Sequence, residues 1–174
     1  MEQATITSAA ETGFVIDGKL AKVGNAITFY VTGDVDVTTD ASATHEDTAL
    51  LTHTGTYLNG SQLSLELLAT ANVEGFERMG VAFSSSAKTK TQIAEAVNSF
   101  TTLGSTKVVN KIAVHNSSVD WSNSSGQYQF RYAPYMTISN IPSNASLYFY
   151  TFAVTDNAVV ISENVSVPIA SITA

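Results

Sequence analysis

The chain has 174 residues, of which 44% are hydrophobic and 13% are charged, and its formal net charge is −7. Only eight lysines and arginines are present and they form no cluster, which excludes nucleic acid and anionic membrane surfaces as main partners, because both require concentrated positive charge. The absence of cysteine excludes disulfides, thiolate metal sites and cysteine nucleophiles.

The first third of the chain is rich in β-formers and turn residues. Asp17-Gly18 is a strong signal for a two-residue hairpin turn, since both positions tolerate positive φ. A second turn is expected at Gly24-Asn25. These signals predict a β-meander with short strands at 14–16, 19–23 and 26–32.

Residues 1–12 are predicted to be a possible N-terminal assembly arm. Within it, residues 3–8 alternate in a pattern that can add a strand to an existing sheet through main-chain hydrogen bonds. The stretch is too weakly apolar to become ordered by itself in water. It therefore pairs either with a sheet edge of a neighbouring subunit or with the first hairpin of its own chain.

The middle of the chain contains a second hairpin and one helix. Asn59-Gly60 is a strong turn signal between two apolar stretches. A helix is predicted at about 90–102, where apolar residues recur at helical spacing after a capping-box pattern at Thr89 and Gln92. Further strands are expected at 50–57, 61–69, 76–84, 106–114 and 127–132.

The stretch 146–167 is predicted to form two long strands joined by a turn at Asp156-Asn157. Both alternating sets of side chains in the first strand are largely apolar, which is typical of a central strand covered on both faces. The residues expected in the core are Phe149, Phe152, Phe83, Leu65 and Ile161.

Many short strands, regular turns and one helix together favour a mainly β fold, an antiparallel β-sandwich of the immunoglobulin-like kind with one inserted helix. No linker composition marks a domain boundary. We therefore expect residues 1–174 to form a single β-sandwich domain.

A family resemblance rests on two segments. Ile141-Pro142 forms an apolar-proline turn ahead of Tyr148 and an alternating strand, and residues 80–84 read Gly-Val-Ala-Phe-Ser. This arrangement, over residues 60–168, resembles fibronectin type III and immunoglobulin-like modules of bacterial surface and phage structural proteins. The resemblance implies that Tyr148 is a structural corner residue whose hydroxyl bonds to upstream backbone. The helix, and the lack of a tryptophan at the usual core position, depart from the family pattern.

An acidic stretch provides the best candidate for a metal site. Asp34, Asp36 and Asp40 lie close together in sequence, and hard oxygen ligands of this kind suit calcium. The calcium-loop pattern of EF-hands fails, since position six is Thr39 and position twelve is His45. The favoured interpretation is a solvated acidic loop without a metal.

Five aromatic residues could form a platform for sugars: Trp121, Tyr128, Tyr132, Tyr135 and Tyr150. Cross-strand pairing within a sheet is the favoured interpretation for the tyrosines. Trp121 lies in a polar loop, so it either closes one end of the sandwich or contacts a partner. Trp121 and Tyr135 are accordingly the possible contact residues.

Motifs of catalysis and cofactor binding are missing. The chain has no G-x-S-x-G elbow, no HExxH, no glycine-rich phosphate loop and no dinucleotide fingerprint. We therefore expect no catalytic residues, no cofactor and no enzyme activity.

Two non-enzymatic functions fit these patterns. The first is a structural subunit of an ordered assembly, such as a capsid decoration or tail protein of a phage virion, with copies of itself or other subunits as partners. The N-terminus shows no basic and apolar export signal, which favours assembly inside a cell. The alternative is a bacterial cell-surface adhesion or carbohydrate-binding module, located outside the cell, with surface glycans as partners.

Overall fold

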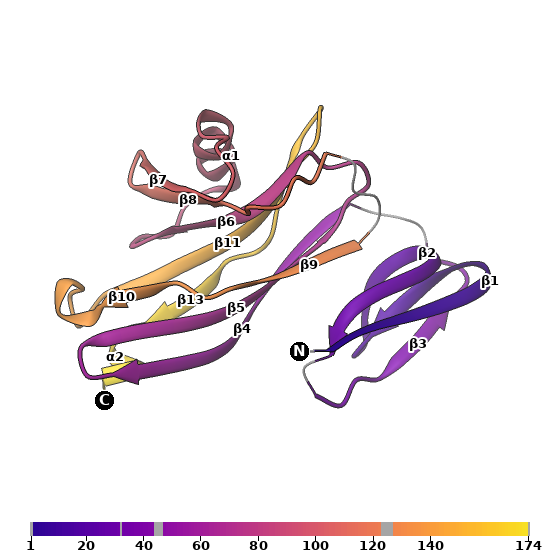
Figure 1. The fold of residues 1–174 in the computed structure, drawn as a ribbon, viewed down its shortest axis with the longest axis horizontal. Helices are drawn as coiled ribbons and strands as arrows, with labels where there is room; N and C mark the ends of the chain where they lie inside the picture. The colour runs from indigo at the N-terminus through magenta and orange to yellow at the C-terminus, as the bar shows by residue number, and fades with distance from the viewer. Residues whose placement is uncertain (1, 32, 44–46, 123–126, 174) are drawn as a thin grey trace.

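A computed structural model describes residues 2–31, 33–43, 47–122 and 127–173 of the chain. The fold is mainly β and every strand pair is antiparallel, as the sequence predicted. Figure 1 shows a small N-terminal sheet beside a larger body that contains two further sheets and the main helix.

The N-terminal sheet has the strand order β2-β1-β3. Its strands are β1 (Glu2–Ile16), β2 (Lys19–Val31) and β3 (Val37–Asp40). Its small hydrophobic cluster is built on Phe14, Ile27 and Phe29 and shares no residue with the core of the larger body.

The predicted meander differs from this sheet in two ways. Gly24 and Asn25 lie within β2 and do not form a turn. The pairing of β1 with β2 is irregular there, with a register shift between the pairs Thr7–Ala26 and Thr12–Gly24. The last strand, β3, pairs with β1 and not with β2. Residues 2–7 pair with β2 of their own chain, which is the intramolecular alternative for the N-terminal arm.

The larger body consists of two sheets whose buried side chains share one hydrophobic cluster. The four-stranded sheet contains β4 (Thr48–Asn59), β5 (Gln62–Asn72), β9 (Gln127–Tyr132) and β10 (Tyr135–Thr137). The six-stranded sheet contains β6 (Arg78–Ser84), β7 (Thr106–Val109), β8 (Ile112–Asn116), β11 (Ser146–Val154), β12 (Val159–Ile161) and β13 (Val165–Pro168).

Alternation along β5 directs one set of side chains into this core. Leu63, Leu65 and Leu67 are completely buried and pack in the same cluster as Phe149 of β11. Phe83 lies near the end of β6, remains half-buried, and stacks on Phe149 with 5.3 Å between ring centroids. The residues between the inward ones form the outer face of the four-stranded sheet, which is turned away from this core.

The helix α1 (Lys90–Ser99) covers the opposite face of the six-stranded sheet (Figure 1). Its residues Ile93 and Val97 share a cluster with Phe152 and Ile161, so β11 is covered on both faces, as predicted. The capping box of Thr89 and Gln92 is formed. The helix ends before the predicted residue 102, because the backbone is already extended at residue 100.

Two hairpins differ from their predicted form. The expected strand 106–114 is a hairpin of β7 and β8, in which Asn110 and Lys111 both adopt positive φ. The second strand of the C-terminal hairpin is interrupted between β12 and β13, and both pieces pair with β11. Two short helical pieces complete the chain, a 3-10 turn (Ile138–Asn140) and α2 (Ala170–Thr173).

Candidate functional site

The strand β4 forms an edge of the four-stranded sheet and carries no protecting charge. It pairs with β5 on one side and, within the described part of the chain, with no strand on the other. Its twelve residues include no Lys, Arg, Asp, Glu or Pro. Tyr57 and Leu58 are 59% and 47% exposed on it. Long apolar edges of this kind template pairing with another strand, and proteins usually block them with charges, proline or bulges.

The other long edge strands carry such protection. The strand β2 contains Lys19 and Lys22, and β9 contains Arg131. The strand β4 has only one register irregularity, between His53 and Gly55. Among the long edge strands described, β4 is therefore the one without charge.

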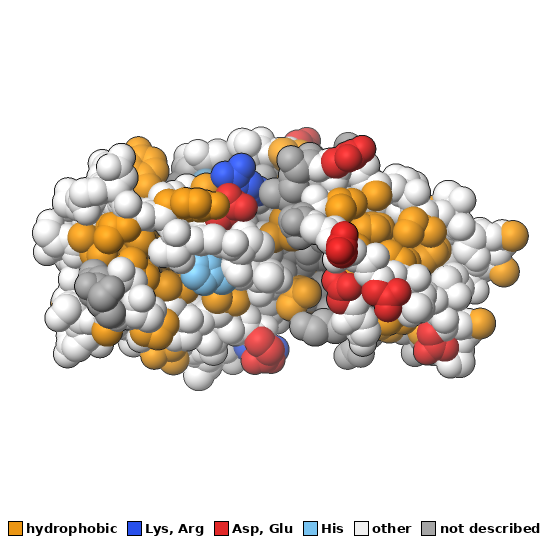
Figure 2. Space-filling view, turned by 90° about the horizontal axis from the view of Figure 1, so that it is seen from below, with side chains coloured by type: hydrophobic (Ala, Val, Ile, Leu, Met, Phe, Trp, Pro, Cys, Tyr) orange, Lys and Arg blue, Asp and Glu red, His pale blue; other side chains and the backbone are white. Residues whose placement is uncertain are grey.

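Charge is divided unequally along the chain. Residues 1–47 contain eight of the fifteen acidic residues and only two lysines, which accounts for −6 of the net charge of −7. In Figure 2 acidic side chains gather over the N-terminal sheet, whereas hydrophobic and uncharged atoms dominate the half of that face formed by the larger body. The larger bodies of two separate subunits can thus approach each other with little electrostatic repulsion.

A groove of about 370 Å³ separates the N-terminal sheet from the outer face of the four-stranded sheet. The N-terminal sheet contributes mainly apolar residues, among them Leu20 and Phe29. Residues from β4, β5 and β9 form the opposite wall. Its neutral polar residues are Thr48, Thr52, Thr54, Thr70, Asn72, Gln127 and Gln129.

Two amide side chains of this wall are buried without satisfying their oxygens. Asn72 and Gln127 are register partners on β5 and β9. The Asn72 Oδ1 and Gln127 Oε1 atoms have no hydrogen-bond donor among the described residues. An unsatisfied buried acceptor costs roughly 1–3 kcal/mol, and both oxygens lie beneath the surface of the groove wall.

The predicted aromatic platform does not form, because Trp121 and Tyr150 are buried and Tyr135 lies on the opposite sheet face from Tyr128 and Tyr132. Trp121 is completely buried, with its ring centroid 5.6 Å from Phe76 and 4.1 Å from Tyr128. It closes the core and is not a contact residue. Tyr150 is also buried and joins the cluster beneath α1.

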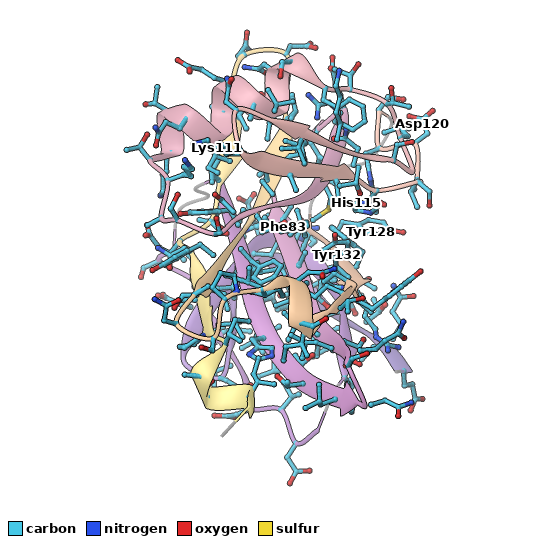
Figure 3. The ribbon with its side chains drawn as sticks, turned by 90° about the vertical axis from the view of Figure 1, so that its left-hand side faces the viewer. Phe83, Lys111, His115, Asp120, Tyr128 and Tyr132 are labelled. Carbon is cyan, nitrogen blue, oxygen red and sulfur yellow. The ribbon has the colours of Figure 1, made fainter. Side chains whose placement is uncertain are left out.

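Tyr132 and His115 instead join the two sheets of the larger body. Their rings stack with 4.7 Å between centroids, and Figure 3 shows them beside Tyr128. Burial lowers the pKa of His115 and raises the pKa of Tyr132 to about 12. The His115 Nδ1 atom lies 2.9 Å from the Thr106 hydroxyl. Both rings are therefore uncharged at neutral pH and serve packing.

Tyr135 is the predicted contact residue that remains available, with 75% of its surface exposed. Across the sheet, Ser64 pairs with both Tyr135 and Tyr57, so the two tyrosines share the outer face. Sequence reasoning missed Tyr57, because the strand order that brings it beside Tyr135 is not encoded locally.

On β11, the tyrosine whose hydroxyl bonds to upstream backbone is Tyr150 and not Tyr148. The Tyr148 hydroxyl, predicted to bond upstream backbone, makes no hydrogen bond to another described residue. Tyr150, two residues further on the same face, donates to the Lys88 carbonyl and accepts from the Lys88 amide. Tyr150 reaches this loop because it lies deeper under the start of α1.

The acidic stretch does not assemble into a metal centre in the described residues, where no three Asp, Glu, His or Cys side chains gather. Asp40 uses its carboxylate to accept from the amide and hydroxyl of Ser42, which lowers its pKa. Asp34 and Asp36 are exposed. His45 lies outside the described residues.

A buried arginine fastens α1 to the six-stranded sheet. Arg78 donates to the Asn116 Oδ1 atom and to the Val97 carbonyl, each at 2.7 Å, and its guanidinium lies 5.8 Å from the Phe152 ring centroid. Burial lowers the pKa of Arg78. These hydrogen bonds hold the C-terminal half of α1 against the sheet.

Comparison with protein-family models, with curated proteins and with solved structures gives no match to this chain. None of the helices in the described ranges is both long and apolar enough to cross a membrane.

Proposed function

We propose that the chain is a non-enzymatic structural subunit of an ordered assembly, and that its subunits join along β4. The observation that carries this proposal is the uncharged twelve-residue edge with Tyr57 and Leu58 exposed on it. A second copy is the simplest partner, because the antiparallel addition of β4 to β4 matches identical surfaces around a two-fold axis.

The energetics of strand addition are sufficient for a stable contact. Pairing along the twelve residues of β4 forms roughly one main-chain hydrogen bond per residue, each worth about 0.5–1.5 kcal/mol net. The sum, roughly 6–18 kcal/mol, is comparable with the 4–15 kcal/mol lost in bringing two proteins together. Burial of Tyr57 and Leu58 then contributes the surplus.

A phage virion is the setting we propose, with the chain as a capsid decoration or tail protein. Three observations support it: a mainly β fold, a sheet edge suited to a neighbouring subunit, and the resemblance of residues 60–168 to modules of such particles. The same fold also suits a cell-surface adhesion module, for which the exposed pair Tyr57 and Tyr135 is the favouring observation.

The test is a charge placed on the edge. Leu58→Lys introduces the side chain that proteins use to block such edges, at a position exposed enough to tolerate it. The matched control is Val108→Lys, at a 66% exposed position of β7, an edge strand that already contains Lys107.

Size-exclusion chromatography with light scattering gives the readout, against a subunit mass of 18.4 kDa. We expect oligomers for the wild type and for Val108→Lys, and monomers for Leu58→Lys with an unchanged melting temperature. A wild type that stays monomeric at every concentration contradicts the proposal, and so does an assembled Leu58→Lys variant.

A further inference from the structure

We propose that the groove between the N-terminal sheet and the four-stranded sheet is a binding site for a neutral saccharide. This inference does not depend on the assembly function, because the groove lies on a face of the sheet and not along the unpaired edge of β4. The groove, at about 370 Å³, has the size of a small-molecule site.

The chemistry of the lining selects the ligand class. One wall has threonine hydroxyls and carboxamides, which both donate and accept hydrogen bonds, and the other wall is mainly apolar. Among the described residues of the lining, Asp17 is the only charged one and no lysine or arginine is present. A phosphate or a carboxylate therefore finds no counter-charge among these residues, whereas a neutral molecule with many hydroxyls finds several hydroxyl and amide partners along the wall.

Two threonines of the wall are available to a ligand. Thr48 and Thr52 on β4 make no side-chain hydrogen bond within the described part of the protein, and both residues line the groove. Threonine hydroxyls both donate to and accept from the hydroxyls of a sugar. The Asn72 Oδ1 and Gln127 Oε1 atoms lie beneath the surface of the wall, so a ligand in the groove does not reach them.

A peptide fits this site less well. The backbone groups of β5, at the middle of this wall, are paired on both sides, so an extended peptide lying over the sheet face adds no main-chain hydrogen bonds to it. Among the described lining residues there is also no positive charge for a peptide carboxylate. The occupant is thus recognised by side-chain hydroxyls and amides alone, as polyhydroxylated molecules are.

The experiment titrates the folded protein with neutral hexasaccharides of glucose, mannose, xylose and N-acetylglucosamine, followed by calorimetry and by amide NMR shifts. Thr52→Val and Thr48→Val remove single hydroxyls with little change of shape, and Thr52→Tyr fills the groove. The control is Thr56→Val, on the same strand but outside the groove lining.

We expect at least one hexasaccharide to bind, with shifts confined to the two walls, residues 16–21, 29, 35, 48–54, 68–72 and 127–129. Each valine variant is expected to bind about fivefold more weakly, Thr52→Tyr not to bind, and Thr56→Val to bind as the wild type. The proposal is overturned if no hexasaccharide shifts these amides, if Thr52→Tyr still binds, or if an anionic polysaccharide binds more tightly. Repeating the titration in Leu58→Lys separates this result from assembly, since Leu58 does not line the groove.

Discussion

Replacement of Gly80, in the middle of β6, by alanine tests how closely α1 and the six-stranded sheet pack. It pairs with Phe152 on one side and Asn116 on the other, on the face that α1 covers. A Cβ at this position would collide with the backbone carbonyl oxygen of His115 and would lie 2.6 Å from the Phe152 ring. A carbonyl held in a sheet cannot rotate away, so Gly80→Ala forces β6 and β8 apart.

Gly80→Ala lowers the free energy of unfolding because it adds an atom to a core that is already close-packed. Such substitutions destabilise by roughly 1–3 kcal/mol. The gain from a stiffer unfolded chain, about 0.4–1 kcal/mol, offsets part of it. We expect a net loss of about 1.3 kcal/mol, or roughly 3–5 °C in melting temperature for a chain of this length.

Thermal unfolding followed by circular dichroism measures this loss. The matched control is Gly33→Ala, where an added Cβ meets no atom within 4 Å and φ is not positive. We expect the control to match or slightly exceed the stability of the wild type. Equal melting temperatures for Gly80→Ala and the wild type would refute the close contact between β6 and β8.

Two further predictions concern the same body. Phe152→Ala removes a completely buried ring and should cost about 3–5 kcal/mol in urea unfolding; a loss below about 1 kcal/mol would show that β11 is peripheral. Burial lowers the pKa of His115 below its ordinary 6.5, so the unfolded chain binds its proton first on acidification. Stability should therefore be complete above about pH 6.5 and decline below it, and His115→Gln should reduce this decline; identical pH profiles of melting temperature would contradict the burial of the ring.

The sequence predicts those features of the fold that depend on neighbours along the chain. The helix follows from its apolar spacing and its capping box at Thr89 and Gln92. The hairpin at Asp17-Gly18 follows from two residues that tolerate positive φ, and both adopt it. The central position of β11 follows from its two apolar faces, because only a strand covered on both sides can bury both sets.

Features that depend on distant contacts could not be predicted in this way. The dipeptide Gly24-Asn25 suits a turn as well as a register shift within a strand. The pairing of β1 with β2, which the local sequence does not show, selects the register shift. Trp121 lies in a polar segment, yet Phe76 and Tyr128 bury it from other parts of the chain. The turn at Asn110-Lys111 contains no glycine, so its signal is weak.

The candidate sites were hidden for the same reason. The status of β4 as an edge depends on strand order, and the groove depends on how the N-terminal sheet lies against β4, β5 and β9. Local patterns instead emphasised the acidic residues Asp34, Asp36 and Asp40, which do not gather into a site in the described structure.

Amide hydrogen exchange of β4 at two protein concentrations tests the assembly role most directly. The amides of β4 that are not bonded to β5 are open to water in an isolated subunit and become hydrogen-bonded when a second strand is added. We predict that their exchange slows by at least about tenfold from low to high micromolar concentration, and that Leu58→Lys abolishes the slowing. Exchange of these amides at the same fast rate at both concentrations would contradict assembly through β4.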